Sequence, residues 1–291
     1  MKILVIVVTY NGMKWIERCL CSVAMSRVKA DCMVVDICST DGTPEWIEEN
    51  FPEVRLVRSE RNLGFGGGNN VGLQVALDED YDYVYLLNQD AWLQRDTFDK
   101  LLEAWDNSRA EGEHFGLLSP MQTTANPDRL DARFQFYYRV SKPMTLGGVK
   151  EMKFIMAAHW MISRECLQDV GGFSPAFSQY GEDDNWLHRA AYHGWRYGAV
   201  NTAFAVHDRD QRPNPKSRRM RLKYVGSVVK LSNPRNSLPL RVVLEPLRLL
   251  AISIRYASWD TLKAIPGFLS KLPEYIRLRR ESKKKGAFLK F

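Results

Sequence analysis

The chain has 291 residues, of which 45% are hydrophobic and 26% are charged, and its formal net charge is +7 at pH 7. This length and composition exclude a peptide-sized module and a largely disordered chain. The charge is uneven, because residues 211–291 hold 20 Lys and Arg against 4 Asp and Glu, a net +16, whereas residues 1–210 hold 21 against 30, a net −9. Such asymmetry predicts an anionic partner for the C-terminal part, either a membrane surface or nucleic acid.

The cysteines and the N-terminus indicate a reducing compartment. The five cysteines are odd in number and form no CxxC pair, so neither a disulfide framework nor a zinc site is expected. The first segment carries one lysine and six consecutive apolar residues before Thr9, which is too short for a signal peptide or a membrane span. We therefore expect it to be the first buried strand of a cytoplasmic protein.

The first 90 residues alternate between strand-like and helix-like segments. Helix-like stretches begin near Met13, Thr43 and Gly67, and they separate apolar runs at residues 2–8, 32–37, 54–57 and 83–88. Short strands separated by helices predict βαβ units and an α/β fold with a mostly parallel central sheet flanked by helices.

Small, amide or acidic residues follow each of these four strands. The strand exits read Thr9-Tyr10-Asn11-Gly12, then Asp36 with Ser39, Asp41 and Gly42, then Asn62 to Gly66, then Asn88-Gln89-Asp90. One such exit is only a turn, but parallel strands bring all four to one crevice at their carboxyl ends, where the ligands of such sheets bind. This clustering predicts a binding site.

The rest of the chain divides near residue 210, where the net charge of the sequence changes from negative to positive. Residues 115–119, 133–140 and 154–163 predict shorter strands, and the acidic stretch 180–195 follows. Beyond residue 212 we expect long basic helices, broken by Pro234, Pro239, Pro246, Pro266 and Pro273. The predicted organisation is a body over residues 1–210, with halves 1–110 and 111–210, and a helical tail over residues 211–291.

Two of the strand exits suggest nucleotide binding. The glycine cluster from Asn62 to Asn69 fits G-x-G-x-x-G poorly, because Asn69 stands in the place of the third glycine, and a dehydrogenase is therefore disfavoured. The cluster either lets the backbone approach a ligand or simply opens a helix. Asp36 could bind a base or a ribose, whereas helix capping explains Thr43 and Pro44.

Asp90 ends a hydrophobic run at a strand tip, where an ionised carboxylate needs water, a partner or a cation. It is well placed to hold Mg²⁺ or Mn²⁺, which prefer oxygen ligands and bridge to diphosphate oxygens. The alternative is a solvated aspartate in a turn. His207, after the strand-like run 203–206, either ligates a metal or makes a hydrogen bond.

Three adjacent carboxylates, Glu182, Asp183 and Asp184, open a predicted helix that runs to Gly194. The helix dipole explains one acid there, at ~0.3–1 kcal/mol. Three adjacent carboxylates repel one another, so the helix dipole does not account for all of them. The additional carboxylates suggest a general base that takes the proton of a hydroxyl group. His159 and Trp160 lie in an apolar run and are a weaker candidate for binding an acceptor, with core packing of Trp160 as the alternative.

The tail combines basic and apolar residues at helical spacing. Arg241, Arg248 and Arg255 recur every seven residues and share one helix face, while leucines, valines and isoleucines fill much of the rest. A basic amphipathic helix is typical of a membrane-surface element, and the alternative is a solvated helix that covers the domain. Nucleic-acid binding is not expected, because no aromatic stacking motif of an RNA-binding module appears.

Taken together, the segments VVTYNG, VVDICSTDGT, NLGFGGGNN, LLNQDA, GGF and YGEDDNW, in this order and spacing, resemble the family-2 glycosyltransferases of the GT-A fold. The resemblance covers roughly residues 1–210. It implies an inverting transfer of a sugar from a nucleoside-diphosphate donor to a hydroxyl acceptor.

The resemblance implies a role for each matching residue. It assigns the donor nucleotide to the strand exits, with binding residues Thr9, Tyr10, Asn11, Asp36, Ser39, Asn62, Gly64, Gly67, Asn69, Asn88 and Gln89. It gives Asp90 and His207 the metal positions and Asp183 the position of the general base, with Glu182 beside it. The sequence departs from the pattern at Ile37, usually Asn, and at Ser174, usually Asp.

Asn88 replaces the leading acid of the family's DxD-like motif, as in the branch that resembles rhamnosyl- and galactofuranosyltransferases. The expected function is rhamnosyl transfer from dTDP-L-rhamnose to a lipid-linked or polysaccharide acceptor in bacterial cell-surface polysaccharide synthesis. We expect a cytoplasmic protein, peripheral on the inner membrane face through its tail. The alternatives are a UDP-galactofuranose donor, a catalytically silent nucleotide-sugar-binding scaffold, or a nucleotidyltransferase.

Overall fold

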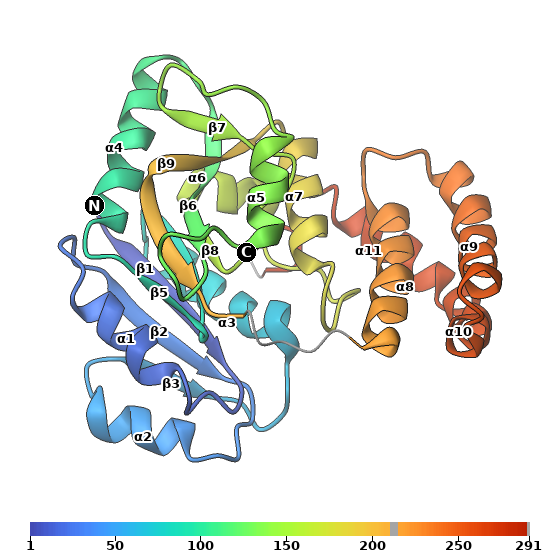
Figure 1. Cartoon of the computed structure of the whole chain (residues 1–291), viewed down its shortest axis with the longest axis horizontal. Coiled ribbons are helices and arrows are strands. Elements are labelled where there is room, and N and C mark those ends of the chain that lie inside the picture. The colour runs from blue at the N-terminus through green and yellow to red at the C-terminus, as the bar shows by residue number, and fades with distance from the viewer. Residues whose placement is uncertain (210–214, 290–291) are drawn as a thin grey trace.

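The computed structural model describes residues 1–209 and 215–289, and it contains one mixed sheet with a group of helices beside it (Figure 1). The strands are β1 (Ile3–Thr9), β2 (Asp31–Asp36), β3 (Arg55–Arg58), β4 (Tyr83–Asn88), β5 (Ala91–Leu93), β6 (Phe115–Thr123), β7 (Val149–Glu151), β8 (His159–Ser163) and β9 (Arg196–His207). The helices are α1 (Ile16–Ala24), α2 (Thr43–Asn50), α3 (Gly64–Asp78), α4 (Thr97–Ala110), α5 (Ala132–Arg139), α6 (Arg164–Val170), α7 (Glu182–Tyr192), α8 (Lys216–Ser232), α9 (Leu238–Arg255), α10 (Trp259–Ser270) and α11 (Leu272–Glu281).

The N-terminal half of the sheet is parallel. Strand β1 pairs with β2 on one side and β4 on the other, and β3 pairs with β2, all in parallel register. The predicted α/β fold is therefore confirmed. Because the four strands point the same way, their polar exits lie at one edge of the sheet.

The second half of the sheet is mixed. Strand β8 runs antiparallel to β4 and to β6, β6 runs parallel to β9, and β5 and β7 pair antiparallel with β9. The order across the sheet is β3-β2-β1-β4-β8-β6-β9-β5, with β7 beside β9. The end of β9 is thus brought to the residues that follow β4.

Helices cover both faces of the sheet. On one face, α1, α2 and α4 contribute Ile16, Ile47 and Phe98 to a buried cluster. On the other, α3, α6 and α7 contribute Leu73, Leu167 and Trp186 to a second cluster. Alternate side chains of β1 enter the two clusters, so the strand is apolar on both sides, as a buried parallel strand requires.

Two predictions for the middle of the chain were wrong. Residues 133–140 are largely the helix α5, because the Asp131 carboxylate caps it by accepting from Arg133 N and Phe134 N, each at 2.9 Å. This local cap outweighs the β-propensity of the aromatic residues. Of residues 154–163, only the second half forms a strand, β8.

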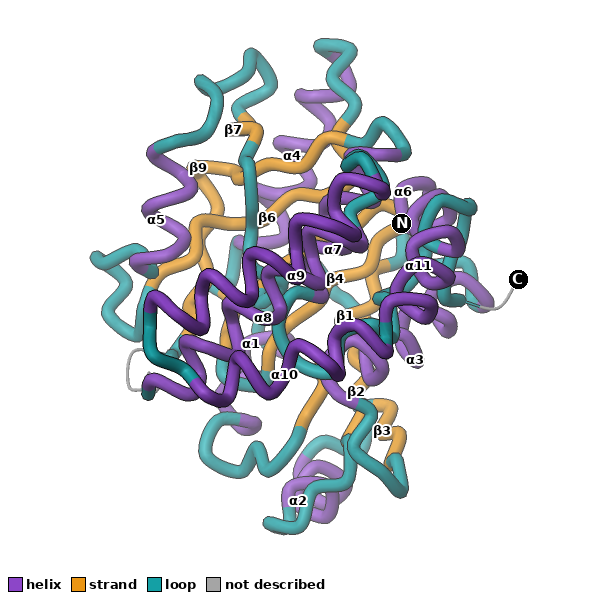
Figure 2. Tube along the Cα trace, turned by 90° about the vertical axis from the view of Figure 1, so that its right-hand side faces the viewer, coloured by secondary structure: helices purple, strands orange, loops and turns teal. Residues whose placement is uncertain are grey.

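The prolines of the tail interrupt fewer helices than expected. Pro246 and Pro266 lie inside α9 and α10, while Pro239 and Pro273 occupy the first turns of α9 and α11, where no intrahelical hydrogen bond is lost. Helices α8 to α11 pack around a third buried cluster that includes Leu231, Leu249 and Phe268. They stand beside the sheet domain, with α9 and α10 in front of the sheet in Figure 2.

The chain returns to the sheet domain near its C-terminus. The Ala287 carbonyl accepts from Gly172 N at 2.9 Å, and the buried Arg189 of α7 stacks on the Phe288 ring at 4.8 Å. The Arg189 guanidinium also donates to the Val170 and Gly172 carbonyls, and burial lowers its pKa to about 9. The last described residues are therefore tied to α7. No helix in the described ranges is long and apolar enough to cross a membrane.

The close approach of α3 to β1 depends on a glycine. A Cβ added at Gly72 would lie 2.7 Å from side-chain atoms of Ile6, and Ile6 is fully buried. We predict that Gly72→Ala lowers the free energy of unfolding by about 1–3 kcal/mol, because the core is overpacked. Gly267→Ala in α10 is the control, since nothing lies within 4 Å of its added Cβ, and it should stabilise by ~0.5–1 kcal/mol. Urea unfolding measures both, and equal effects would contradict the packing argument.

Candidate active site

A cavity opens where the ends of β1 and β4 face α7 and α8. It encloses about 1110 Å³, including its open mouth. The structure brings together seven of the residues predicted from the sequence, all of which line it: Tyr10, Asn88, Gln89, Asp90, Glu182, Asp183 and His207. Residues expected on the donor side and on the catalytic side thus share one cavity.

The pairing of β5 with β9 places Asp90 beside His207. Ala91 is opposite His207 in this ladder, and Asp208 N donates to the Asp90 carbonyl at 2.8 Å. The His207 Nε2 atom lies 3.6 Å from Asp90 Oδ1, and both side chains are buried. Neither ring nitrogen of His207 has a hydrogen-bond partner among the residues that the structure describes.

The pair Asp90 and His207 fits part of a metal site. Carboxylate oxygen and imidazole nitrogen both bind divalent first-row cations, and a buried imidazole without a partner leaves a lone pair for such an ion. Within residues 1–209 and 215–289, no group of three or more His, Cys, Asp or Glu is arranged to hold a metal. Among the described residues, this pair therefore offers two ligands, and substrate phosphates and water would have to complete the shell, as they do for Mg²⁺ at many phosphate sites.

Two carboxylates at the start of α7, Glu182 and Asp183, also line the cavity, whereas the adjacent Asp184 does not. Burial, and then the charge of Asp183, raises the pKa of Glu182 to about 7, and the Glu182 Oε2 atom has no hydrogen-bond partner among the described residues. Burial also raises the pKa of Asp183, and it raises that of Asp184 to about 7. The cluster can therefore hold or accept a proton near neutral pH.

A fixed cation, Arg209, lies in the cavity two residues beyond His207. Its Nε and Nη2 atoms donate to the Asp131 carboxylate at 2.6 and 2.7 Å, a bidentate pair. Burial raises the pKa of Asp131, but the hydrogen bonds and charge of Arg209 more than offset this, and the net pKa lies below its usual range. Asp131 thus both caps α5 and orients Arg209.

Helix α8 closes the cavity with Arg218 and Leu222. The Arg218 Nε atom donates to the Tyr180 hydroxyl at 3.2 Å, and its guanidinium lies 5.3 Å from the Tyr180 ring centre. Tyr180 and Gly181 both have positive φ, 70° and 87°. A Cβ at Gly181 would come within 2.6 Å of Val225 on α8, so this turn and α8 are in direct contact.

Several predicted donor residues lie beside the cavity instead of lining it. The buried Thr9 hydroxyl donates to Gln89 Oε1 at 2.8 Å, and Tyr10 N donates to the same oxygen at 2.8 Å. The Asp36 carboxylate accepts from the Ser39 amide and hydroxyl, and the Ser39 hydroxyl accepts from Asn11 N at 2.8 Å. These bonds fix the strand exits, while the neighbouring Ile37 contributes to the cavity wall.

The glycine cluster also packs against the fold. Asn62 accepts from Gly64 N at 2.8 Å, and the buried Asn69 donates to the Phe65 carbonyl within α3 at 2.9 Å. Gly67 lies within α3, and the residue of this segment that lines the cavity is Phe65. The roles proposed for Asn62, Gly64, Gly67 and Asn69 in nucleotide binding remain predictions.

His159 and Trp160 are not placed to bind an acceptor, which corrects the weaker expectation. Both are 0% exposed, and neither lines the cavity. The Val206 carbonyl can only accept, so His159 Nε2 donates to it at 3.0 Å, and Nδ1 accepts from the Tyr85 hydroxyl at 2.9 Å. Burial lowers the pKa of His159 to about 3, so the ring is neutral and connects Tyr85 of β4 to Val206 of β9.

Sequence reasoning missed the three arginines of the site, Arg133, Arg209 and Arg218. Arg209 follows His207 closely, and that position was a usable signal. Arg133 lies 4.0 Å from the carboxylate of Asp184, and Arg218 was counted only as part of the tail's positive charge. Pairing across 78 residues between Asp131 and Arg209 leaves no local pattern in the sequence.

Comparison with known proteins identifies relatives across most of the chain. The family model described as Glycosyl transferase family 2 matches residues 4–171. An N-acetylglucosaminyl-diphospho-decaprenol L-rhamnosyltransferase of Mycobacterium tuberculosis is 25% identical over 231 residues, covering 70% of this chain and 75% of that protein.

Two solved structures show the same fold. The TarS 1–349 structure from S. aureus matches 97% of this chain and 82% of its own, with a TM-score of 0.62 and 19% identity. The mannosyltransferase PcManGT from Pyrobaculum calidifontis, solved with GDP-Man and Mn²⁺, matches 97% of this chain and 86% of its own, with a TM-score of 0.55 and 19% identity. The expected GT-A architecture is confirmed.

The raised pKa values of the α7 carboxylates predict a pH-dependent stability. A folded-state pKa of about 7 for Glu182, against 4.5 for an ordinary Glu, means that the folded protein binds protons which the unfolded chain has released. The resulting stabilisation is complete below about pH 4.5 and is lost as the pH rises through about 7. We expect the free energy of unfolding to fall over this interval.

Glu182→Gln should reduce the difference in the free energy of unfolding between pH 5 and pH 8 by about 1–3 kcal/mol, because the titrating group is removed. Urea unfolding at pH 5 to 8 measures the slope. Glu274→Gln, a change at an exposed glutamate of α11, is the matched control and should leave the slope unchanged. An unaltered slope in Glu182→Gln would contradict the assigned direction of its pKa.

Proposed function

The chain belongs to glycosyl transferase family 2, and from this premise we propose that it is an inverting enzyme that moves a sugar from a nucleoside diphosphate to an acceptor hydroxyl. One observation carries the proposal: the Asp90 and His207 pair and the raised-pKa carboxylates Glu182 and Asp183 all line a single cavity. The Asp90 and His207 pair suits a cation that binds the diphosphate of the donor, and the carboxylates suit removal of a proton from the acceptor hydroxyl.

We assign the general base to Asp183. Its carboxylate takes the proton of the acceptor hydroxyl while the hydroxyl oxygen attacks the anomeric carbon. The bond from that carbon to the diphosphate oxygen breaks on the opposite side, and its electron pair leaves with the diphosphate, which inverts the anomeric configuration. Glu182, with a pKa of about 7, lies beside Asp183 and can share the proton with it.

The leaving diphosphate needs positive charge. Asp90 and His207 would hold Mg²⁺ or Mn²⁺, which neutralises a diphosphate leaving group when bound. Arg209, held by Asp131, and Arg218, held on Tyr180, add fixed positive charge from the chain itself. Because these guanidinium groups are already oriented, little reorganisation is needed as charge develops on the phosphate oxygens.

Our choice of donor and acceptor rests on the relatives and on Asn88. The similarity to a rhamnosyltransferase whose name includes a diphospho-decaprenol supports dTDP-L-rhamnose as donor and a lipid-linked acceptor of cell-surface polysaccharide synthesis. UDP-galactofuranose is the alternative donor. A nucleotidyltransferase would instead exchange pyrophosphate, and a silent scaffold would bind nucleotide without transfer.

The base assignment predicts the behaviour of Asp183→Asn. We expect sugar transfer to fall by ~10²–10⁴-fold, because no group takes the acceptor proton, while donor binding persists. Asp184→Asn is the matched control at the next position, and it should retain most activity because Asp184 does not line the cavity. Full transfer by Asp183→Asn, or loss in Asp184→Asn alone, would overturn the assignment.

The donor class can be found by thermal stabilisation. We expect one of dTDP, UDP and GDP to raise the melting temperature in the presence of Mg²⁺ or Mn²⁺, since binding at 100-fold over Kd adds about 2.7 kcal/mol. Asp90→Ala should lose the metal-dependent part of the shift. Stabilisation by none of the three would contradict the proposed donor site, and stabilisation without transfer would favour the scaffold.

A further inference from the structure

Helix α9 presents an apolar face to solvent. Its exposed apolar residues follow helical periodicity, so they lie along one side of the helix: Leu240, Val243, Leu244, Leu247, Leu250 and Ile254. We call these six residues the α9 face. Their exposed fractions run from 40% at Leu244 to 74% at Ile254. A contiguous row of large apolar side chains on a surface helix indicates a surface that another body covers.

Three charged residues of α9, Arg241, Glu245 and Arg248, lie on another side of the helix. Glu245 is 1% exposed, and its carboxylate oxygens lie 3.0 Å from Arg241 Nη1 and 3.5 Å from Arg248 Nη1. Arg248 also donates to the Ser227 hydroxyl on α8 at 2.9 Å. Arg248 thus joins α9 to α8, while Arg241 pairs with Glu245 within α9. Helix α9 is therefore apolar on two sides, because Leu249 is buried among the helices while the α9 face stays exposed, whereas an ordinary surface helix turns its apolar side inward.

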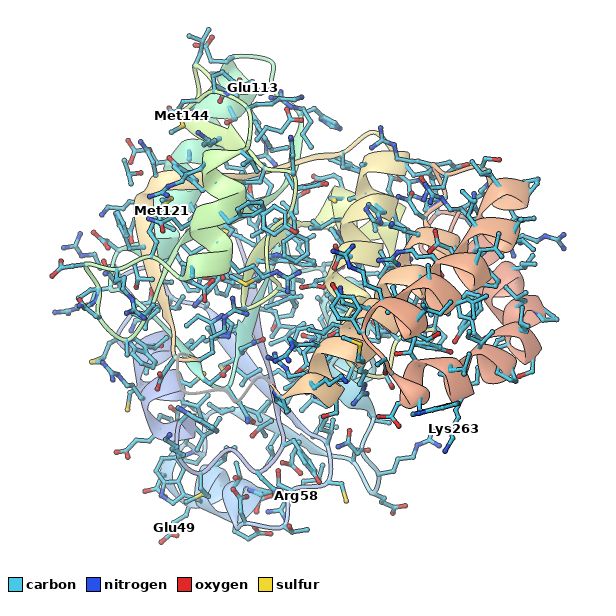
Figure 3. The ribbon with its side chains drawn as sticks, turned by 45° about the vertical axis from the view of Figure 1, so that its right-hand side comes forward. Glu49, Arg58, Glu113, Met121, Met144 and Lys263 are labelled. Atoms are coloured by element: carbon cyan, nitrogen blue, oxygen red, sulfur yellow. The ribbon has the colours of Figure 1, made fainter. Side chains whose placement is uncertain are left out.

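The turn after α9 adds an amphipathic aromatic residue. Trp259, the first residue of α10, is 72% exposed, and Tyr256 just before it is 37% exposed. Tryptophan and tyrosine favour the interface between lipid and water, because the ring is apolar and its polar atom stays hydrated. Exposed cations lie nearby in sequence at Arg255, whose guanidinium is 5.7 Å from the Tyr256 ring centre, and at Lys263, which projects from the helices in Figure 3.

Charge decides between the bodies that could cover this face. Residues 211–291 carry a net +16, from 20 Lys and Arg against 4 Asp and Glu. A second copy docked through the same face would bring two strongly cationic units together, and they would repel. An anionic lipid surface has the complementary charge and also accepts the apolar side chains.

We propose that the α9 face is the membrane-docking surface of this protein, which lies flat on anionic lipid with the six apolar side chains and Trp259 in the interface. This inference deepens the proposed function, because α8 both supports α9 and contributes Arg218 and Leu222 to the cavity. Docking through α9 therefore holds the cavity at a fixed position relative to the lipid, where a lipid-linked acceptor would be presented.

The test is sedimentation of the full-length protein with vesicles. The wild type should bind vesicles of phosphatidylglycerol and phosphatidylcholine at least ~10-fold more tightly than vesicles of phosphatidylcholine alone. Leu247→Glu/Ile254→Glu should reduce binding to the anionic vesicles by at least ~10-fold, because two carboxylates replace apolar groups at the interface. Leu146→Glu is the matched control, an 89% exposed leucine far from α9, and it should bind as the wild type does.

Two further measurements keep the outcomes distinct. Nucleotide-induced thermal stabilisation of the double variant should equal that of the wild type, which would show that its fold and donor site are intact. If the proposed function is wrong, the nucleotides will not stabilise the wild type either, whatever the result with vesicles. Sedimentation velocity reports the oligomeric state. Undiminished vesicle binding by the double variant would overturn the proposal, and so would a wild-type dimer that the double variant converts to monomers.

Discussion

The ladder between β5 and β9 is the constraint on which the site depends. It is only three residue pairs long, yet it sets Ala91 opposite His207 and thereby brings the residue after β4 to the end of a strand more than one hundred residues away in the chain. His159 supports it from behind, because its Nε2 donates to the Val206 carbonyl while Tyr85 holds its Nδ1. A shift of β9 by one residue would turn His207 to the other side of the sheet.

Charge is organised on both sides of this ladder. Arg209 leaves the end of β9 and is fixed by Asp131, which is also the cap of α5. The carboxylates of α7 face the same cavity, where burial makes their protons hard to release. Arginines that suit phosphate and carboxylates that can accept a proton thus come from different parts of the chain and line one cavity, to which α8 contributes Arg218, bonded to Tyr180.

Much of the parallel half followed from local pattern, because buried parallel strands are continuous apolar runs and their exits are polar turns. The four strands, the helix at Thr43, and the gathering of Tyr10, Asn88 and Asp90 were foreseen on that basis, whereas Asp183 and His207 were joined to them through the resemblance to a family. The sequence did not indicate α5, whose aromatic residues favour a strand until the Asp131 cap is taken into account. It also did not show which side of α9 turns inward, because helical spacing shows which residues share a face but not where that face points.

The central claim, that Asp90 and His207 act as one cation-dependent donor site, is tested most directly by Mn²⁺ titration in the presence of the stabilising nucleoside diphosphate, with free Mn²⁺ followed by electron paramagnetic resonance. We expect Asp90→Ala and His207→Ala each to weaken Mn²⁺ binding by at least ~10-fold, and the double variant to lose less binding free energy than the sum of the two single losses. Wild-type Mn²⁺ affinity in His207→Ala, or strictly additive losses, would contradict the claim.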